Sequence, residues 1–545
     1  MDVAELTESE REVWAAFAKG LPVRFLAGET VRAEVLVALL LGVRPAEPGH
    51  IARLTLSGAT VTGPLDLRDA EITAPIALTE CELTEQITLD YARIRRLDLT
   101  GSSLPRLQAK QVRMAGDLVL RSCRITGGID LAGATVDGIM VLNHLRVSHE
   151  QFALHAPRLT IEHSIYGADL QTEGGIFLPG AQISGGLHLR EARLTATASE
   201  DEALNISRAS IGDDVNLTKG SEITGLIRMT RTHIRGQLTM TSARLVQPGG
   251  GRVWKADNLR VDQNVNCAEL EATGEIRLVG AQIGGDLVLS GARLDNPDGY
   301  ALDAGHLEVS GGLRCDSGFA ANGAIRLVAA EIDVLELQPA EPLTQDLDLR
   351  HARLRILRDD PAMIAGAAQL DGLDYSALDP VLGVPERLDW LSRQPEGYRP
   401  QPYEQLAATY RRLGQDADAR RVLLAKQRQR RTTLPPVARL WGRLQDWMVG
   451  YGYLPARAAG WLLALLAIGT AVFATHRPNP VQPGPPFNPL VYTLDVLLPV
   501  VKLGQEQAFS PAGPVTQWCG YLLLIAGWVL ATTIAAAISR TLTRN

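Results

Sequence analysis

The first residues whose types could do chemistry are four histidines in one irregular stretch. His144, His149, His155 and His163 all lie between residues 143 and 165. Imidazole nitrogens are common zinc ligands, so four of them predict a zinc site only if folding brings them together. The nearest catalytic pattern, His149-Glu150 with His155, spaces its histidines six residues apart, whereas one helical face needs about four. We therefore interpret the stretch as a polar loop or bulge and predict no metal site.

Cysteines and nucleotide-binding loops give no catalytic pattern either. The five cysteines are far apart in the sequence and odd in number, which argues against a disulfide framework or a paired-cysteine metal site. They are Cys81, Cys123, Cys267, Cys315 and Cys519. The sequence has no dinucleotide-binding glycine motif after a strand, no phosphate-binding P-loop and no GxSxG elbow. We predict no catalytic residue and no cofactor.

A basic stretch near the C-terminal third is a candidate lipid-binding site. The sequence AKQRQRR occupies 425–431 and includes Arg428, Arg430 and Arg431. Near anionic lipid, each such cation contributes about 1 kcal/mol to binding. The alternative is that the arginines belong to a solvated helix end with no binding role.

A short apolar segment, FNPLVYTLDVLLPVVKLGQ at 487–505, is the second candidate site. Its run of about 15 mostly apolar residues is too short to cross a bilayer, which indicates a re-entrant or interfacial helix. The candidate residues are Asp495, Pro499, Lys502, Gly504 and Gln505. A potassium filter of the TVGYG type is absent, and Lys502 would disfavour cation passage if it faced a pore. An interfacial anchor and a pore helix both remain open.

Most of the chain consists of a short repeat. From Leu56, apolar residues recur every five or six positions, at Val61, Leu67, Ile72, Leu78, Leu83, Leu89, Ile94, Leu99 and Leu104. A small residue stands two positions before every second one, at Ala59, Ala70, Cys81, Ala92 and Ser102. Residues i and i−2 of a strand point the same way, so both sets face one narrow interior. The pattern predicts a β-solenoid with four short faces and about 21–22 residues per coil.

Glycine pairs recur between these strands. They occur at 127–128, 174–175, 185–186, 284–285 and 311–312. We expect them at the corners of the coil with positive φ, a conformation that costs glycine little.

The repeats resemble those of pentapeptide-repeat proteins. The steps ATV, AEI, ARI and ARL carry the resemblance, which covers about 300 residues. It implies a mainly β fold, a right-handed quadrilateral β-helix. The competing fold is a leucine-rich repeat, which would need a helical stretch and an Asn or Cys ladder in each repeat.

The whole chain also resembles actinobacterial proteins labelled "membrane-associated oxidoreductase". The shared stretches include VRAEVLVALLLG, RPQPYEQLAATYRRLGQDADARRVLLAKQRQRR and LQDWMVGYGY. The label implies a redox cofactor, for which the sequence shows no binding motif.

The C-terminal region predicts two membrane spans. An uncharged stretch of about 18 residues begins at Ala458, and a second covers 519–539, so each can cross a bilayer as a helix. Eleven Lys and Arg residues lie between 404 and 457, whereas the intervening loop holds only Arg477 and Lys502. The positive-inside rule then places both chain ends in the cytoplasm. We predict an integral plasma-membrane protein with a cytoplasmic solenoid.

Five regions follow from these patterns. They are a helical cap at 1–50, the β-solenoid at 51–357, a Pro-rich connector at 358–402, a basic helical hairpin and juxtamembrane segment at 403–455, and the two-span module at 456–545.

Charge divides the chain and bears on its partners. Residues 401–545 hold 15 Lys and Arg against 6 Asp and Glu, which leaves 39 against 55 in the first 400. An acidic solenoid argues against nucleic-acid binding. The function that we predict is a membrane-anchored, non-enzymatic scaffold for unknown cytoplasmic protein partners. The alternatives are an oligomeric pore gated by the solenoid, which requires a homo-oligomer, and a membrane-associated oxidoreductase.

Overall fold

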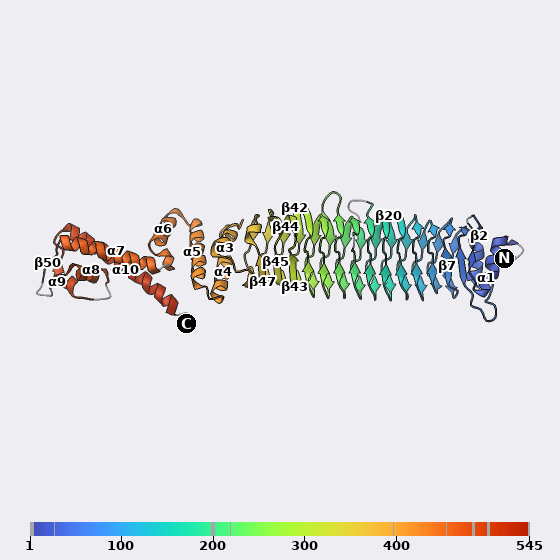
Figure 1. The fold of residues 1–545 in the computed structure, drawn as a ribbon, viewed down its shortest axis with the longest axis horizontal. Coiled ribbons are helices and arrows are strands. Elements are labelled where there is room, and N and C mark those ends of the chain that lie inside the picture. Colours follow the sequence, from blue (N-terminus) through green and yellow to red (C-terminus); the bar gives the residue numbers. More distant parts are fainter. Residues whose placement is uncertain are drawn as a thin grey trace. The chain divides into compact units, whose positions relative to one another are not determined.

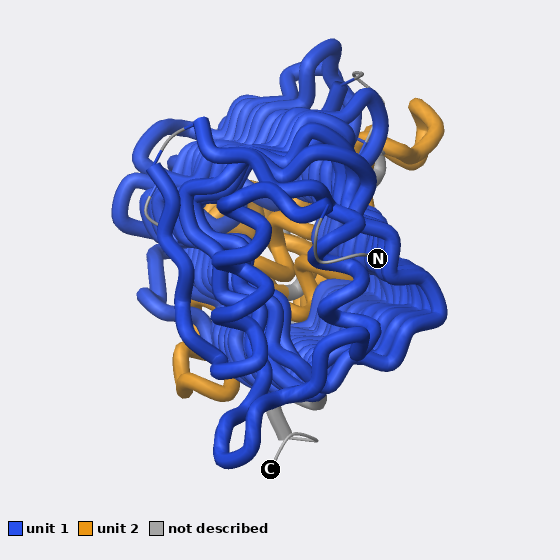
Figure 2. The backbone as a smooth tube through the Cα atoms, turned by 90° about the vertical axis from the view of Figure 1, so that its right-hand side faces the viewer, with its two compact units in different colours: residues 1–395 blue, residues 396–545 orange. Residues whose placement is uncertain are grey.

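The computed structural model describes residues 5–26, 28–197, 202–218, 220–395, 397–453, 455–481, 486–498 and 502–542. The chain forms two compact units, residues 1–395 and residues 396–545 (Figure 2). The first unit is a parallel β-solenoid with helices at its ends, and the second unit is helical.

The solenoid stacks about 15 coils of short parallel strands (Figure 1). The strands form four ladders, one for each face of the coil, which confirms the predicted four-faced solenoid. Ladder A runs from β3 (Leu54–Ser57) to β49 (Asp374–Leu378). Ladder B runs from β4 (Thr60–Thr62) to β44 (Ala320–Arg326), and ladder C from β5 (Leu65–Asp66) to β48 (Ala368–Gln369). Ladder D runs from β6 (Glu71–Ile72) to β49.

The recurring aliphatic residues fill the interior of the coils, as the five- to six-residue spacing predicted. Leu56, Leu78 and Leu99 have no exposed surface. Burying one leucine side chain contributes about 1.5–3 kcal/mol, so the stacked columns are the main source of stability. The small position is also inward. Ser102 is buried there, and its hydroxyl donates a 2.8 Å hydrogen bond to the carbonyl of Leu78. Ala70 is only half-buried.

Coil length varies more than the expected 21–22 residues. Arg93 pairs with Arg113, 20 residues later, whereas Gln182 pairs with Ser210, 28 residues later. The inward columns stay in register in spite of this difference, since Ile183 still pairs with Ile211. The irregular stretch at 143–165 contains such a departure: β20 (Arg146–His155) shifts register between Ser148 and Phe152.

Three of the five glycine pairs do not have the positive φ that we expected. In the pairs at 185–186, 284–285 and 311–312, neither glycine has a positive φ. A Cβ on Gly284 would lie 2.2 Å from the carbonyl oxygen of Asp262, one coil earlier. Glycine is needed there because successive coils approach closely. Many corners are instead turned by non-glycine residues in the left-handed conformation, His144 with φ 56° among them.

The N-terminal end of the solenoid is covered by α1 (Glu8–Lys19) and α2 (Ala33–Leu40). Between these helices, β1 (Val23–Arg24) and β2 (Thr30–Arg32) pair with β3 and β4, so parallel strands begin before residue 51. Glu10 of α1 is 1% exposed and accepts a 2.8 Å hydrogen bond from Nε of Arg32. This bond lowers the pKa of Glu10 to about 2.

The C-terminal end of the solenoid lies within the predicted connector. Residues 358–402 include η2 (Pro361–Met363), β48, β49 and α3 (Val384–Ser392). Arg387 of α3 forms an ion pair with Asp359, the last residue of β47 (Arg353–Asp359). Nη1 lies 2.7 Å from both carboxylate oxygens, and each side chain is 1% exposed. This buried pair attaches α3 to the final coils.

The second unit begins with three helices. They are α4 (Pro400–Arg412), α5 (Asp416–Thr432) and α6 (Pro436–Val449). The buried face of α4 includes Leu406 and Tyr410, and that of α5 includes Val422 and Leu423. Leu413, the residue after the last turn of α4, is 49% exposed.

The remainder of the second unit contains two long apolar helices, α7 (Pro455–Thr475) and α10 (Pro514–Leu542). Each includes a 19-residue stretch long and apolar enough to cross a membrane, Arg457–Thr475 and Pro514–Thr532. Between them lie α8 (Pro489–Leu497), α9 (Gln505–Ala508) and the antiparallel pair of β50 (Asn479–Pro480) and β51 (Phe509–Ser510).

Candidate functional site

The basic stretch at 425–431 lies at the end of α5. Arg428 and Arg431 both contact the carboxylate of Asp446 on α6, at 3.0 Å and 3.2 Å. Asp446 therefore compensates part of their charge, whereas Arg430 is exposed. The stretch offers a lipid surface less free positive charge than its composition indicates, and lipid contact stays a prediction.

The apolar segment at 487–505 contains α8, and the residues before it explain where that helix begins. The Asn488 side chain accepts hydrogen bonds from the backbone N–H groups of Leu490 and Val491, at 3.0 Å and 3.3 Å. Pro489 follows as the first helical residue, where its missing N–H costs nothing. This cap fixes the start of a nine-residue helix that would be marginal in isolation.

The buried face of α8 packs between α7 and α10. Tyr492, Val496 and Leu497 form a cluster with Phe473 of α7 and Leu523 of α10. The rings of Tyr492 and Phe473 meet edge to face, with centroids 4.8 Å apart. The short helix is thus held by both long apolar helices.

Two glycines allow this close approach. A Cβ on Gly469 of α7 would lie 2.4 Å from the methyl group of Thr493, and one on Gly527 of α10 would lie 1.9 Å from the carbonyl oxygen of Leu497. Gly527 is 13 residues inside α10, or about 20 Å at 1.5 Å per residue. The carboxyl end of α8 therefore lies beside the middle of α10 (Pro514–Leu542), and not beside its end.

Two buried polar side chains organise the chain after α8. The carboxylate of Asp495 accepts hydrogen bonds from the backbone N–H groups of Leu503, at 2.7 Å, and Glu506, at 2.8 Å. The amide of Gln505 accepts from the N–H of Asn488, at 3.3 Å, and donates to the carbonyl of Pro486, at 3.0 Å. Asp495 and Gln505 are each 4% exposed. Together they hold the segment after α8 against both ends of that helix.

The other candidate residues of the segment are placed differently. Lys502 and Gly504 are exposed, and Gly504 has a φ of 82°. Pro499 lies outside the described residues. Sequence reasoning did not find Gly469, Gly527 or the Asn488 cap. Single glycines in otherwise apolar helices, and Asn-Pro before a short apolar run, were the available signals.

The four histidines lie apart, each with its own partner. His144 pairs with Asp169 at 3.1 Å and His155 with Asp130 at 3.2 Å, while His163 contacts the carbonyl of Asp137. The ring of His149 accepts backbone N–H groups inside its own bulge. In the part of the chain that the structure describes, no group of three or more His, Cys, Asp or Glu residues is placed to hold a metal ion.

Four cysteines occupy inward positions of the solenoid. Cys81, Cys123, Cys267 and Cys315 are all buried. Burial raises the pKa of the Cys123 and Cys267 thiols to about 12. Since the thiolate is the reactive form, these side chains act as small apolar residues of the core.

No protein-family model, no curated protein and no solved structure matches the chain. The resemblance to pentapeptide-repeat proteins therefore rests on the repeat pattern and on the four-faced coil, and the oxidoreductase label has no support beyond the shared stretches of sequence.

Proposed function

We propose that this protein is a membrane-anchored, non-enzymatic scaffold, whose solenoid presents a long surface to cytoplasmic protein partners. The observation that carries the proposal is the combination of a rod-like stack of about 15 coils with two helices long and apolar enough to cross a membrane. A stack with a filled interior offers repeated outer faces for binding, and the helices confine that surface to a membrane.

The apolar helices support the anchor through their exposed side chains. Leu463 and Ile468 of α7 are 66% and 58% exposed, and Leu522 and Ile525 of α10 are 66% and 62% exposed. Large apolar patches of this kind favour contact with lipid or with another protein. The excess of Lys and Arg before α7 supports an orientation in which the helices lie in the plasma membrane and the solenoid lies on its cytoplasmic side.

The anchor and the partner surface are tested separately. Alkaline carbonate should leave the full chain in the membrane fraction, whereas a chain that ends before α7 should become soluble. A photo-cross-linking residue placed in turn at outward positions of one ladder should capture the same protein at several neighbouring coils. Extraction of the full chain by carbonate refutes the anchor. Absence of any cross-linked partner along all four ladders refutes the scaffold.

A pore is the second candidate, and the position of α8 favours it. A short helix whose end reaches the middle of a long apolar helix, followed by a segment that buried Asp495 and Gln505 hold in place, is the arrangement that lines water-filled paths at membrane depth. The proposal requires several copies of the chain around one axis. Mass measurement of the detergent-solubilised protein, together with conductance in planar bilayers, tests it. A monomer without conductance removes this candidate and leaves the scaffold in place.

A further inference from the structure

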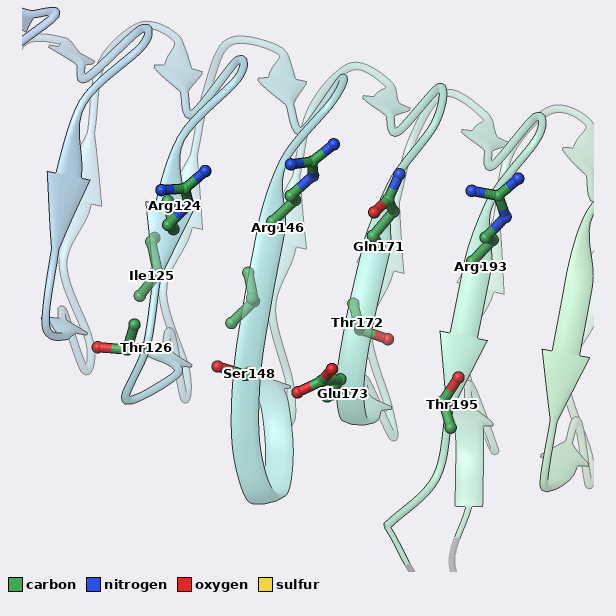
Figure 3. A pocket seen from close by; sticks show the side chains of 11 residues that line it. Arg124, Ile125, Thr126, Arg146, Ser148, Gln171, Thr172, Glu173, Arg193 and Thr195 are labelled. Atoms are coloured by element: carbon green, nitrogen blue, oxygen red, sulfur yellow. The ribbon is translucent and has the colours of Figure 1, made fainter.

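A groove lies on ladder B, where it crosses four consecutive coils. The strands are β16 (Arg124–Ile125), β20, β23 (Gln171–Phe177) and β26 (Arg193–Thr195). Arg124 pairs in register with Arg146, Arg146 with Gln171, and Gln171 with Arg193. Figure 3 shows these four side chains as one row, with the three guanidinium groups at the same level. The groove has a volume of about 340 Å³, within the usual range for small-ligand sites.

Arg124 and Arg146 lie on neighbouring coils with like charges side by side. Parallel strands are about 4.8 Å apart, and like charges at facing positions are destabilising. Both side chains are exposed, and neither forms an ion pair with a carboxylate among the described residues. Arg244, in the same outward row of ladder B, differs because its register partners are Glu222 and Glu271.

The neutral and acidic side chains of the groove form a second row. Thr126, Ser148, Glu173 and Thr195 lie two residues further along the same strands (Figure 3), or about 7 Å from the first row. Between the rows, Thr172 is 4% exposed and occupies the inward position of its strand, in register with the buried Val147 and Leu194.

Two other carboxylates near the arginine row already have partners. Asp169 accepts a 3.1 Å hydrogen bond from the amide of Gln171 and pairs with His144. Arg193 is 3.8 Å from Glu222. Glu173 is therefore the acidic residue that faces the groove itself, and it excludes a ligand that is anionic at both rows.

We propose that this groove binds a small phosphorylated polyol. One phosphate lies between Arg124 and Arg146, whose planar guanidinium groups can donate to several phosphate oxygens at once. The hydroxyl groups of the ligand lie over the second row, where Glu173 accepts and the Thr and Ser hydroxyls both donate and accept. The site is independent of the membrane anchor and goes beyond the scaffold function.

Titration calorimetry on the full chain in detergent tests the arginine row. The probes are fructose 6-phosphate, which carries one phosphate and several hydroxyls, and tripolyphosphate, which carries phosphates alone. The double variant R124Q/R146Q should weaken both probes by about 100-fold, since each lost charge-assisted hydrogen bond weakens binding by about tenfold or more. The control R244Q, in the same row, should change affinity less than about twofold. Failure of the wild-type chain to bind either probe, or an equal loss in R244Q, overturns the site.

The variant E173Q tests the second row with a difference in sign. Removal of its charge should strengthen tripolyphosphate binding, because the carboxylate repels any phosphate near it. The same change should weaken fructose 6-phosphate, because the carboxylate is a better acceptor for hydroxyls than the amide is. A change in the same direction for both probes overturns the assignment of hydroxyls to the second row. Because the variants lie in the solenoid, membrane retention of the chain should not change, and this separates the outcome from the test of the anchor.

Discussion

Replacing Gly527 by valine should loosen the packing of α8 against α10. A Cβ at this position would lie 1.9 Å from the carbonyl oxygen of Leu497, and real Cβ contacts are never closer than 3.0 Å. The carboxyl end of α8 must therefore move by at least about 1 Å, because the obstacle is backbone and cannot rotate away. Overpacking of this kind costs about 1–3 kcal/mol.

Hydrogen exchange of the α8 amides in detergent measures this cost. If the helix opens locally, its protection should fall by about 5-fold to 150-fold, which corresponds to the same 1–3 kcal/mol. Gly520→Val is the matched control, because it makes the same change in the same helix at a glycine with nothing within 4 Å. Gly469→Ala should have a smaller effect than Gly527→Val, since it meets the movable ends of the Thr493 and Leu523 side chains.

Equal protection of α8 in Gly527→Val and Gly520→Val would refute the packing described for this segment. A loss of protection along the whole of α10 in both variants would point instead to a general effect of valine on the helix, and would likewise contradict the reasoning.

Three further predictions concern the solenoid. Glu10 has a pKa lowered to about 2, so its contribution to stability is present above about pH 4.5 and disappears as the pH falls toward 2. This contribution amounts to less than about 3 kcal/mol. Glu10→Gln should therefore flatten the pH dependence of amide hydrogen exchange in α1. Asp359→Ala should lower the free energy of unfolding by about 3–5 kcal/mol, because it leaves Arg387 buried without its carboxylate, and an Asp359→Leu/Arg387→Met double variant should melt closer to the wild-type temperature. Cys123 and Cys267 should resist alkylation at pH 8 until denaturant is added, as their raised pKa values require; rapid labelling of the native chain would contradict their burial.

The fold was predictable because one physical requirement repeats along the chain. Each coil must bury an aliphatic residue on every face, so four positions already specify the four faces and the interior. In the first coil they are Leu56, Val61, Leu67 and Ile72. The ends were harder to predict. Val23 and Leu378 lie outside the run of repeats recognised in the sequence, and the adjacent coil establishes the pairing of their strands.

The candidate sites were less predictable, for the same kind of reason. The sequence indicated a short apolar helix at 487–505, but its position depends on contacts with Gly469 and Gly527, which are far from it along the chain. The groove on ladder B was not predictable from local sequence. Arg124 and Arg146 are 22 residues apart, and only the register of successive coils brings them together. Charge composition gives the total for a surface, whereas a site depends on which charges become neighbours.

The segment between α7 and α10 has more fixed structure than a membrane anchor requires. Two apolar helices are sufficient to hold a chain in a bilayer, and a nine-residue helix adds little to them. Burying a carboxylate beside apolar helices costs energy unless its oxygens are hydrogen-bonded, and Asp495 meets this condition by binding two backbone N–H groups of the return segment. Gly527 lowers the helix propensity of α10, and its lack of a side chain leaves room for the end of α8. These costs are understandable if function depends on the fold of this segment. A pore requires Asp495 and Gly527 to maintain that fold, whereas a membrane anchor does not.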